Sequence, residues 1–246
     1  MSVKTLFLAW QAKQNQGWYP IGQLDVDVDS ADYRFRYIQG AKQAQEEVGF
    51  IPLMEFPDLS GKYHSHELFP TFTNRIMSRS RPDFAKYMHS LDLNETMNPI
   101  ESLYVNGGYR ATDAYEVFPK IEKHEDGSFT CRFLLHGSRH LDSEAQSVID
   151  TLTPGEKLYV QVERDNPASG LAVKIHTTDS QHIGWTPRYL ADDLVAAIDE
   201  TNDYSAHVVR VNLPPAPSSR RVLIELNGRW GRHEPMSGDD FKPIVF

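Results

Sequence analysis

A pair of histidines has the type and spacing that metal chemistry needs. His64 and His66 lie two positions apart beside Glu67, and on a strand both imidazoles would face the same side. Imidazoles next to a carboxylate are possible metal ligands. Ten histidines scattered over 246 residues also produce such pairs by chance, and no further ligand lies nearby in the sequence. We therefore expect neither a metal site nor a cofactor.

Residue types that serve in catalysis occur, but not in catalytic arrangements. Ser138, His140 and Asp142 match the residue types of a catalytic triad, yet side chains so close in sequence rarely assemble one. The sequence Asn106-Gly107-Gly108 resembles a phosphate-binding loop but lacks the lysine and the hydroxyl residue that should follow. It predicts a turn. We therefore expect a protein that is not an enzyme.

Cations gather around a tryptophan near the C-terminus, and two interpretations remain open. Cations mixed with a stacking ring are typical of proteins that bind single strands of nucleic acid. The apolar residues of 222–226 instead predict a strand that packs on a neighbour. The residues concerned are Arg220, Arg221, Arg229, Trp230, Arg232 and His233.

Length and composition predict a folded protein of one large or two small domains. Of the 246 residues, 40% are hydrophobic and 24% are charged, as is usual for globular proteins. No apolar run approaches the roughly 20 residues of a membrane helix, and the apolar stretch near the N-terminus is too short for a signal peptide. The single cysteine, Cys131, allows no internal disulfide. We expect a soluble, cytoplasmic protein without membrane contact.

The net charge of −9 argues against a large nucleic-acid footprint. Residues 106–212 hold 17 acidic and 10 basic side chains, so the middle of the chain is its most acidic part. Proteins that bind nucleic acid usually carry a broad basic surface. Any such contact must therefore be local, in a cleft, at one end or on the C-terminal tail.

Alternating side chains predict the elements that would position these residues. Strands are expected at 6–10, 21–28, 33–37, 129–135, 158–163, 171–175, 183–185 and 208–211. A helix should begin at Arg81, another should span 143–152, and a third should be capped by Thr186 with Pro187 in its first turn. The short strands and capping helix of the second half favour a small β-barrel.

An ordered series of short motifs runs through this second half. They are Gly137-Ser138-Arg139, Gly155-Glu156-Lys157-Leu158, Arg164, Asn166-Pro167, Ala172-Val173-Lys174-Ile175 and Ile183-Gly184-Trp185-Thr186-Pro187. This order resembles the HIRAN domain. The resemblance implies an oligonucleotide-binding-like barrel that, in helicase-linked members, grips the 3′ end of single-stranded DNA.

The resemblance also implies a groove that binds nucleic acid, and this sequence departs from the family's pattern in one turn of that groove. Arg139 corresponds to a phosphate-facing arginine of the family, Asn166 to a turn asparagine, and His140 stands where an aromatic ring stacks on the base. After Pro167 the family's Tyr-Asp-x-Asn is replaced by residues 168–171, so one stacking ring and the carboxylate that meets the 3′ hydroxyl are missing. The residues expected to line the groove are Arg139, His140, Arg164, Asn166, Lys174 and Trp185.

Motifs in the first hundred residues suggest a different relationship. They are Ile21-Gly22-Gln23-Leu24, Phe35-Arg36-Tyr37, Pro52-Leu53, Phe56-Pro57 and Leu68-Phe69-Pro70. This series is similar to the small N-terminal subdomain of HipA-type kinases, without the kinase body. In some toxin–antitoxin systems that subdomain is a separate protein that restrains its kinase, which implies a protein-binding role.

Together these patterns predict an α+β protein in three parts. A HipA-N-like α+β domain would span 1–105, an OB-like HIRAN barrel with capping helices would span 114–212, and a Pro-rich linker with a basic tail would span 213–246. The expected function is non-catalytic binding of DNA, as single strands or 3′ ends. The alternative is a regulatory module for a protein partner such as a kinase-like toxin, in a bacterial toxin–antitoxin or defence locus.

Overall fold

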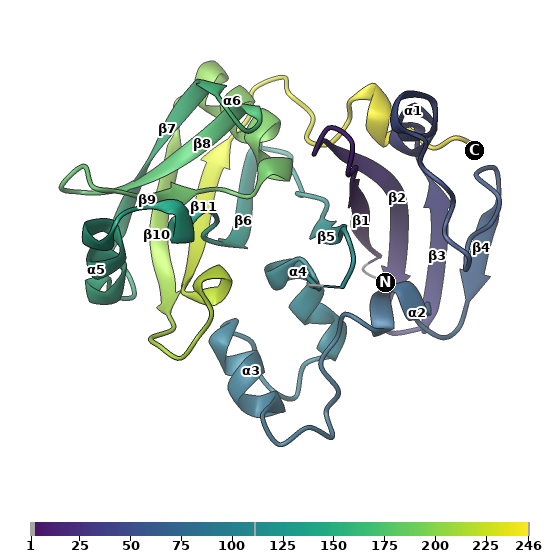
Figure 1. Ribbon diagram of the computed structural model, residues 1–246, viewed down its shortest axis with the longest axis horizontal. Helices are drawn as coiled ribbons and strands as arrows, with labels where there is room; N and C mark the ends of the chain where they lie inside the picture. The colour runs from purple at the N-terminus through teal and green to yellow at the C-terminus, as the bar shows by residue number, and fades with distance from the viewer. Residues whose placement is uncertain (1–2, 111, 246) are drawn as a thin grey trace. The chain divides into compact units, whose positions relative to one another are not determined.

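The computed structural model describes residues 3–110 and 112–245, which form two compact units (Figure 1). The first unit is built from the segments 3–85, 95–110, 112–120 and 236–245, and the second from 86–94 and 121–235. Within the described residues, no helix has the length and apolar character to cross a membrane.

The first unit contains an antiparallel sheet with the strand order β4-β3-β2-β1-β5. Its strands are β1 (Lys4–Gln11), β2 (Trp18–Asp27), β3 (Asp32–Tyr37), β4 (Lys62–Ser65) and β5 (Tyr115–Pro119). Its helices are α1 (Gln39–Val48), α2 (Pro70–Thr73), η1 (Pro99–Ser102), α4 (Leu103–Asn106) and η5 (Asp239–Phe241). The strands predicted at 6–10, 21–28 and 33–37 are confirmed.

Aromatic rings fill the core of the first unit. Phe35 stacks on Phe56 with ring centroids 3.9 Å apart, and both side chains are fully buried. The Phe35 ring lies directly over Gly22 on the neighbouring strand, where a Cβ atom would come within 2.4 Å of the ring. Glycine at this position therefore leaves room for the Phe35 ring to pack directly on the strand.

The second unit contains an antiparallel sheet with the strand order β6-β11-β10-β7-β8-β9. Its strands are β6 (Ser128–Leu134), β7 (Lys157–Asn166), β8 (Gly170–Thr177), β9 (His182–Trp185), β10 (Tyr204–Val211) and β11 (Val222–Arg229). Its helices are η2 (Ser138–His140), α5 (Ser143–Thr151), η3 (Arg188–Leu190), α6 (Ala191–Glu200) and η4 (Ser218–Arg220), while α3 (Phe84–Ser90) crosses the division between the units.

The expected closed barrel is wrong, because the second sheet stays open. The described residues form no strand ladder between the outer strands, β6 and β9, and the chain after β6 makes only an isolated bridge from His136 to Trp185. Strand β9 has 4 residues and stops before Pro187, which has no N–H to donate. It is too short to pair along β6.

Two further expectations need correction. Thr186 is not the cap of α6, since η3 comes first and Leu190 occupies the N-cap. Residues 213–246 do not form a separate tail either. They contribute β11, which lies between β6 and β10 (Figure 1), and the segment 236–245 belongs to the first unit. The apolar residues of 222–226 therefore form a central strand of the sheet.

Candidate nucleic-acid interface

The outer face of β7, β8 and β9 carries the polar and aromatic side chains of the candidate site. Along each strand, alternate residues turn inward: Leu158, Val173, Ile175 and Ile183 are fully buried. Their neighbours point to the opposite face, since successive strand residues alternate. Lys174 pairs in register with Gln161 on one side and Trp185 on the other, which places the three side chains in one row.

Glu163 joins several predicted site residues. Its carboxylate accepts hydrogen bonds from Asn166 Nδ2 at 2.7 Å and Trp185 Nε1 at 3.1 Å, and it forms an ion pair with Lys174 Nζ at 2.8 Å. The bonds from Lys174 and Asn166 lower the pKa of Glu163 to about 2. The carboxylate therefore stays ionised, fixes the indole ring and neutralises much of the Lys174 charge.

Arg139 and His140 lie side by side at the end of the same region. Arg139 Nε donates to His140 Nε2 at 3.1 Å, and both side chains are exposed. The bridge between His136 and Trp185 consists of two backbone hydrogen bonds of 2.9 Å, and it anchors the turn just before η2. Because η2 follows directly, the cation and the imidazole lie near β9.

Arg164 does not join this group. Its guanidinium donates to both carboxylate oxygens of Asp199 on α6, at 2.9 and 2.8 Å. Asn166 lies in the region, but its side-chain oxygen accepts from the backbone N–H groups of Ala168 and Ser169. It therefore shapes the β7–β8 turn. The structure brings Arg139 to His140, and Asn166 and Lys174 to Trp185, while Arg164 is bound elsewhere.

Sequence reasoning missed four side chains on this outer face: Tyr159, Glu163, His176 and His182. The His182 ring lies 4.4 Å from Trp185 and 5.2 Å from His176, centroid to centroid. Tyr159 is 42% exposed, and Lys157 Nζ lies 5.1 Å from its ring centroid. The alternation of 157–163 could have indicated Tyr159 and Glu163, but the neighbours of the histidines follow from strand register, which the sequence does not reveal.

Glycine at position 137 permits the close approach of η2 to β9. Gly137 has φ +71°, and an added Cβ would come within 2.5 Å of the Trp185 ring. We expect Gly137→Ala to lower the free energy of unfolding by more than the ~1–2 kcal/mol of left-handed backbone strain, because the indole must also move.

The control for this substitution is Gly155→Ala. Gly155 has φ +87°, and a Cβ there would meet nothing within 4 Å, so only the backbone cost applies. Urea denaturation followed by circular dichroism measures both variants. An equal loss of unfolding free energy in the two variants would show that the clash with Trp185 adds nothing to the backbone cost.

Two members of the cluster near the C-terminus, Trp230 and Arg229, have structural contacts. Trp230 is 1% exposed and stacks on Phe129 with ring centroids 3.8 Å apart, so it is not available to a nucleic-acid base. Its indole N–H donates to the Asp193 carbonyl at 2.7 Å. Arg229 donates to the Asp126 carbonyl at 3.0 Å. The interpretation of this cluster as a stacking site is therefore not supported.

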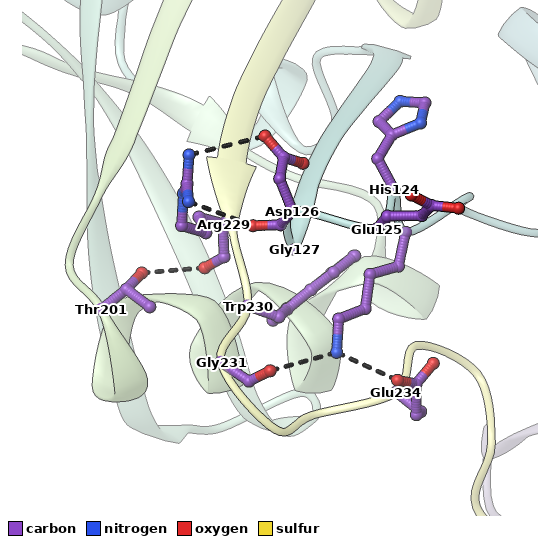
Figure 2. Close-up of a pocket in the computed structure, with 10 residues that line it drawn as sticks. His124, Glu125, Asp126, Gly127, Thr201, Arg229, Trp230, Gly231 and Glu234 are labelled. Carbon is purple, nitrogen blue, oxygen red and sulfur yellow. Dashed lines mark hydrogen bonds and ion pairs between the residues drawn. The ribbon is translucent and has the colours of Figure 1, made fainter.

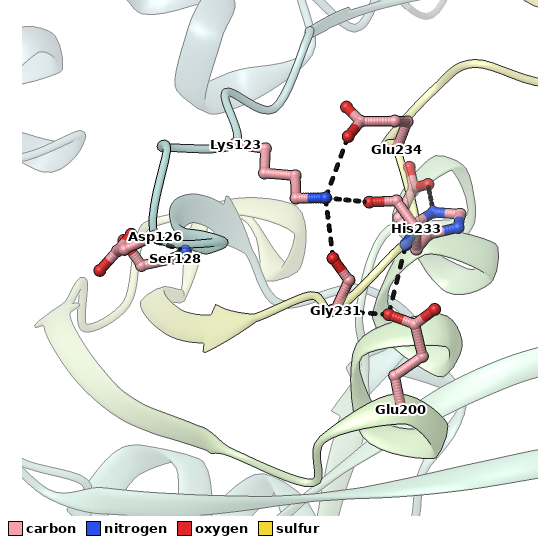
Figure 3. Close-up of polar contacts among 8 residues, drawn as sticks. Lys123, Asp126, Ser128, Glu200, Gly231, His233 and Glu234 are labelled. Atoms are coloured by element: carbon pink, nitrogen blue, oxygen red, sulfur yellow. Dashed lines mark hydrogen bonds and ion pairs between the residues drawn. The ribbon is translucent and has the colours of Figure 1, made fainter.

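A pocket of about 590 Å³ in the second unit lies beside this buried ring. Figure 2 shows its wall, in which Arg229 reaches Asp126. Lys123 Nζ also donates to the Gly231 carbonyl and to Glu234. In Figure 3 the Lys123 ammonium group lies between these two residues and the carbonyl of His233. Arg229 and Lys123 therefore bind other residues of the pocket or its surroundings, and these contacts stabilise the fold.

The residues considered for catalysis or metal binding have structural contacts. His64 Nε2 lies 2.6 Å from Asp32 Oδ1, and among the described residues no group of three or more His, Cys, Asp or Glu side chains could hold a metal ion. Asp142 caps α5 by accepting from Ala145 N. Burial raises the pKa of the Cys131 thiol to about 12, so it stays protonated.

Comparison with known proteins identifies the second unit. The family model of the HIRAN domain matches residues 128–228, from the start of β6 into the end of β11, and this part of the chain is a HIRAN domain. No curated protein matches the chain.

Two solved structures are similar to it. A Lactobacillus plantarum protein from a structural genomics consortium shares 16% identity over 43% of this chain and 100% of its own, with a TM-score of 0.34. The HIRAN domain of human HLTF shares 18% identity over 47% of this chain and 89% of its own, with a TM-score of 0.31.

The comparisons give no support to the other resemblance. The matched family model does not reach the first unit, and no match relates residues 1–105 to HipA-type kinases. The expected kinase-like toxin partner and the bacterial toxin–antitoxin setting rested on that resemblance, and they too have no support.

Proposed function

We propose that the HIRAN domain of this chain binds single-stranded DNA through the outer face of β7, β8 and β9 together with η2. HIRAN domains are in general nucleic-acid-binding modules. The residues proposed to contact the strand are Arg139, His140, Lys174 and Trp185, with Asn166 holding the turn beside them. The proposal contains no catalytic step.

One observation carries this proposal: the bridge between His136 and Trp185, which brings the exposed Arg139–His140 pair next to an indole ring. A guanidinium group binds a phosphate with two hydrogen bonds, and an indole presents a face to a base. A single strand offers both partners at short range, because its bases are free to turn away from one another.

The charge of the domain supports a small footprint. Glu163 neutralises much of the Lys174 charge, and Arg164 is paired with Asp199. Few cations therefore remain to replace counterions. For single strands the logarithm of the affinity falls with the logarithm of the salt concentration by roughly 0.7 per phosphate contact. We expect a slope that corresponds to one to three contacts on this scale.

The altered turn bears on strand ends. Residues 168–171 lack the ring and the carboxylate expected for recognition of a 3′ hydroxyl, and Asn166 is used to close the turn. We expect the domain to bind strands with a 3′ hydroxyl and strands with a 3′ phosphate with similar affinity. End recognition as the main activity would instead give a clear preference for the hydroxyl.

The test is fluorescence anisotropy of the full chain with labelled DNA at two salt concentrations. Single strands ending in a 3′ hydroxyl, single strands ending in a 3′ phosphate, and blunt duplexes are compared. Arg139→Ala should weaken single-strand binding several-fold and reduce the salt slope, because one phosphate contact is lost.

The matched control is Arg229→Ala, which removes an arginine from the same unit that is used within the wall of the pocket. It should leave the affinity unchanged. Binding that is indifferent to Arg139→Ala and to salt would reject the proposed function.

A further inference from the structure

We propose, resting on the function above, that Tyr159, His176, His182 and Trp185 form a row of stacking rings for consecutive bases of a single strand. The row crosses three strands of the sheet, from β7 through β8 to β9. This row would extend the binding path beyond the Arg139–His140 pair, and its rings would contact the bases of the strand.

The rings follow one another across the strands. His182 and Trp185 are 4.4 Å apart in a T-shaped arrangement, with an interplanar angle of 90°. His176 and His182 are 5.2 Å apart and tilted by 34°. Tyr159 is the register partner of His176 on β7, and directly opposed side chains on antiparallel strands lie within contact distance. The rings of His176, His182 and Trp185 are therefore neighbours, and Tyr159 lies opposite His176 in register.

The domain does not need this row for its core. The buried residues of the same strands lie on the opposite face, where Leu158, Ile175 and Ile183 are fully buried. Tyr159 is 42% exposed, and His176, His182 and Trp185 are partly exposed. Rings that reach solvent on one face of an open sheet offer π-surfaces to a ligand.

The cations beside the row favour a nucleic-acid strand over an apolar partner. Lys157 Nζ lies 5.1 Å from the Tyr159 ring centroid at one end, and Arg139 follows the bridge to Trp185 at the other. Lys174 lies within the row as the register partner of Trp185. Stacking rings with cations along the same track are the combination that holds single strands, whereas the bases of a duplex are already stacked on each other.

His182 acts here as a neutral ring. Burial and the proximity of His176 lower the pKa of His182, so its imidazole carries no charge at neutral pH. The attraction expected from the row is therefore base stacking. It should respond to the presence of bases and only weakly to salt.

An abasic strand separates base stacking from phosphate binding. The full chain is titrated with an oligothymidylate and with an abasic strand of the same length, which keeps the phosphates and lacks the bases. The wild type should prefer the oligothymidylate. The double variant His176→Ala, His182→Ala should bind the oligothymidylate about fivefold or more weakly and should bind the abasic strand as the wild type does.

The chain offers a matched control in its first unit. His64 and His66 are also a T-shaped histidine pair, with ring centroids 5.0 Å apart, so His64→Ala, His66→Ala removes the same groups elsewhere. It should leave both affinities unchanged. Tyr159→Ala is a second test with little effect on folding, since this ring is the most exposed of the row, and it should also reduce the preference for bases.

The outcomes distinguish the two proposals. If the wild type binds neither strand, the proposed function fails. If the wild type binds DNA through Arg139 but the histidine and tyrosine variants keep the full preference for bases, the stacking row is wrong and the proposed function survives. If the wild type binds both strands equally, the row is also wrong.

Discussion

Trp230→Ala is expected to lower the free energy of unfolding of the second unit by about 3–5 kcal/mol, the usual cost of truncating a large buried aromatic side chain. Trp230 is 1% exposed and stacks on Phe129 with ring centroids 3.8 Å apart, so its removal leaves a cavity beside Phe129. The Asp193 carbonyl also loses the hydrogen bond that it accepts from the indole N–H. Urea denaturation of the full chain measures the loss.

The comparison with Trp230→Phe separates the two contributions. Phenylalanine keeps a ring against Phe129 but cannot donate to the Asp193 carbonyl, so it should cost less than alanine. Hydrogen–deuterium exchange of the β10 and β11 amides should locate the destabilisation in the second unit. A Trp230→Ala variant as stable as the wild type would show that the ring is not part of the core.

The strands could be predicted because their alternation is local. In β3 the residues Tyr33, Phe35 and Tyr37 turn inward while Arg34 and Arg36 turn outward, and this period of two is visible in the sequence itself. The same holds for β7 and β8. The start predicted for α6 is wrong because a short helix, η3, intervenes, with Pro187 at its N-cap and no side-chain cap.

The open sheet could not be predicted, because closure depends on distant pairing. Short strands with turns are typical of barrels. Whether the outer strands meet depends on the length of β9, which stops at Trp185. The prediction of a linker and tail over 213–246 was wrong for a similar reason. Residues 222–226 have a strand pattern, but their position between β6 and β10 comes from contacts far apart in sequence.

The proximity of some candidate residues could be predicted where a motif contains them. Arg139, Asn166, Lys174 and Trp185 belong to the ordered series, and the structure links Asn166 and Lys174 to Trp185 through Glu163. The role of Glu163 could not be identified from the sequence, because its contacts with Lys174 and Trp185 depend on the register of three strands. Its contacts show that it positions the groups around it.

Acid should destabilise the second unit in a window set by His136. Burial lowers the pKa of His136 from 6.5 to about 4, so below pH 6.5 the unfolded chain binds a proton that the folded chain does not. Stability is therefore fully present above pH 6.5 and falls as the pH drops toward 4. One proton corresponds to a slope of up to about 1.4 kcal/mol per pH unit, or about 3 kcal/mol over the window.

A variant without the imidazole isolates this effect. His136→Leu keeps the backbone hydrogen bonds to Trp185 but cannot titrate, so its unfolding free energy should fall less between pH 6.5 and 4 than that of the wild type. Below this window both proteins should lose stability together, because the lowered pKa of Glu163, about 2, adds a loss between pH 4.5 and 2. Urea denaturation at several pH values gives both slopes. Identical slopes above pH 4 would mean that His136 takes up its proton equally well in the folded chain, and the bridge to Trp185 would then hold in weak acid.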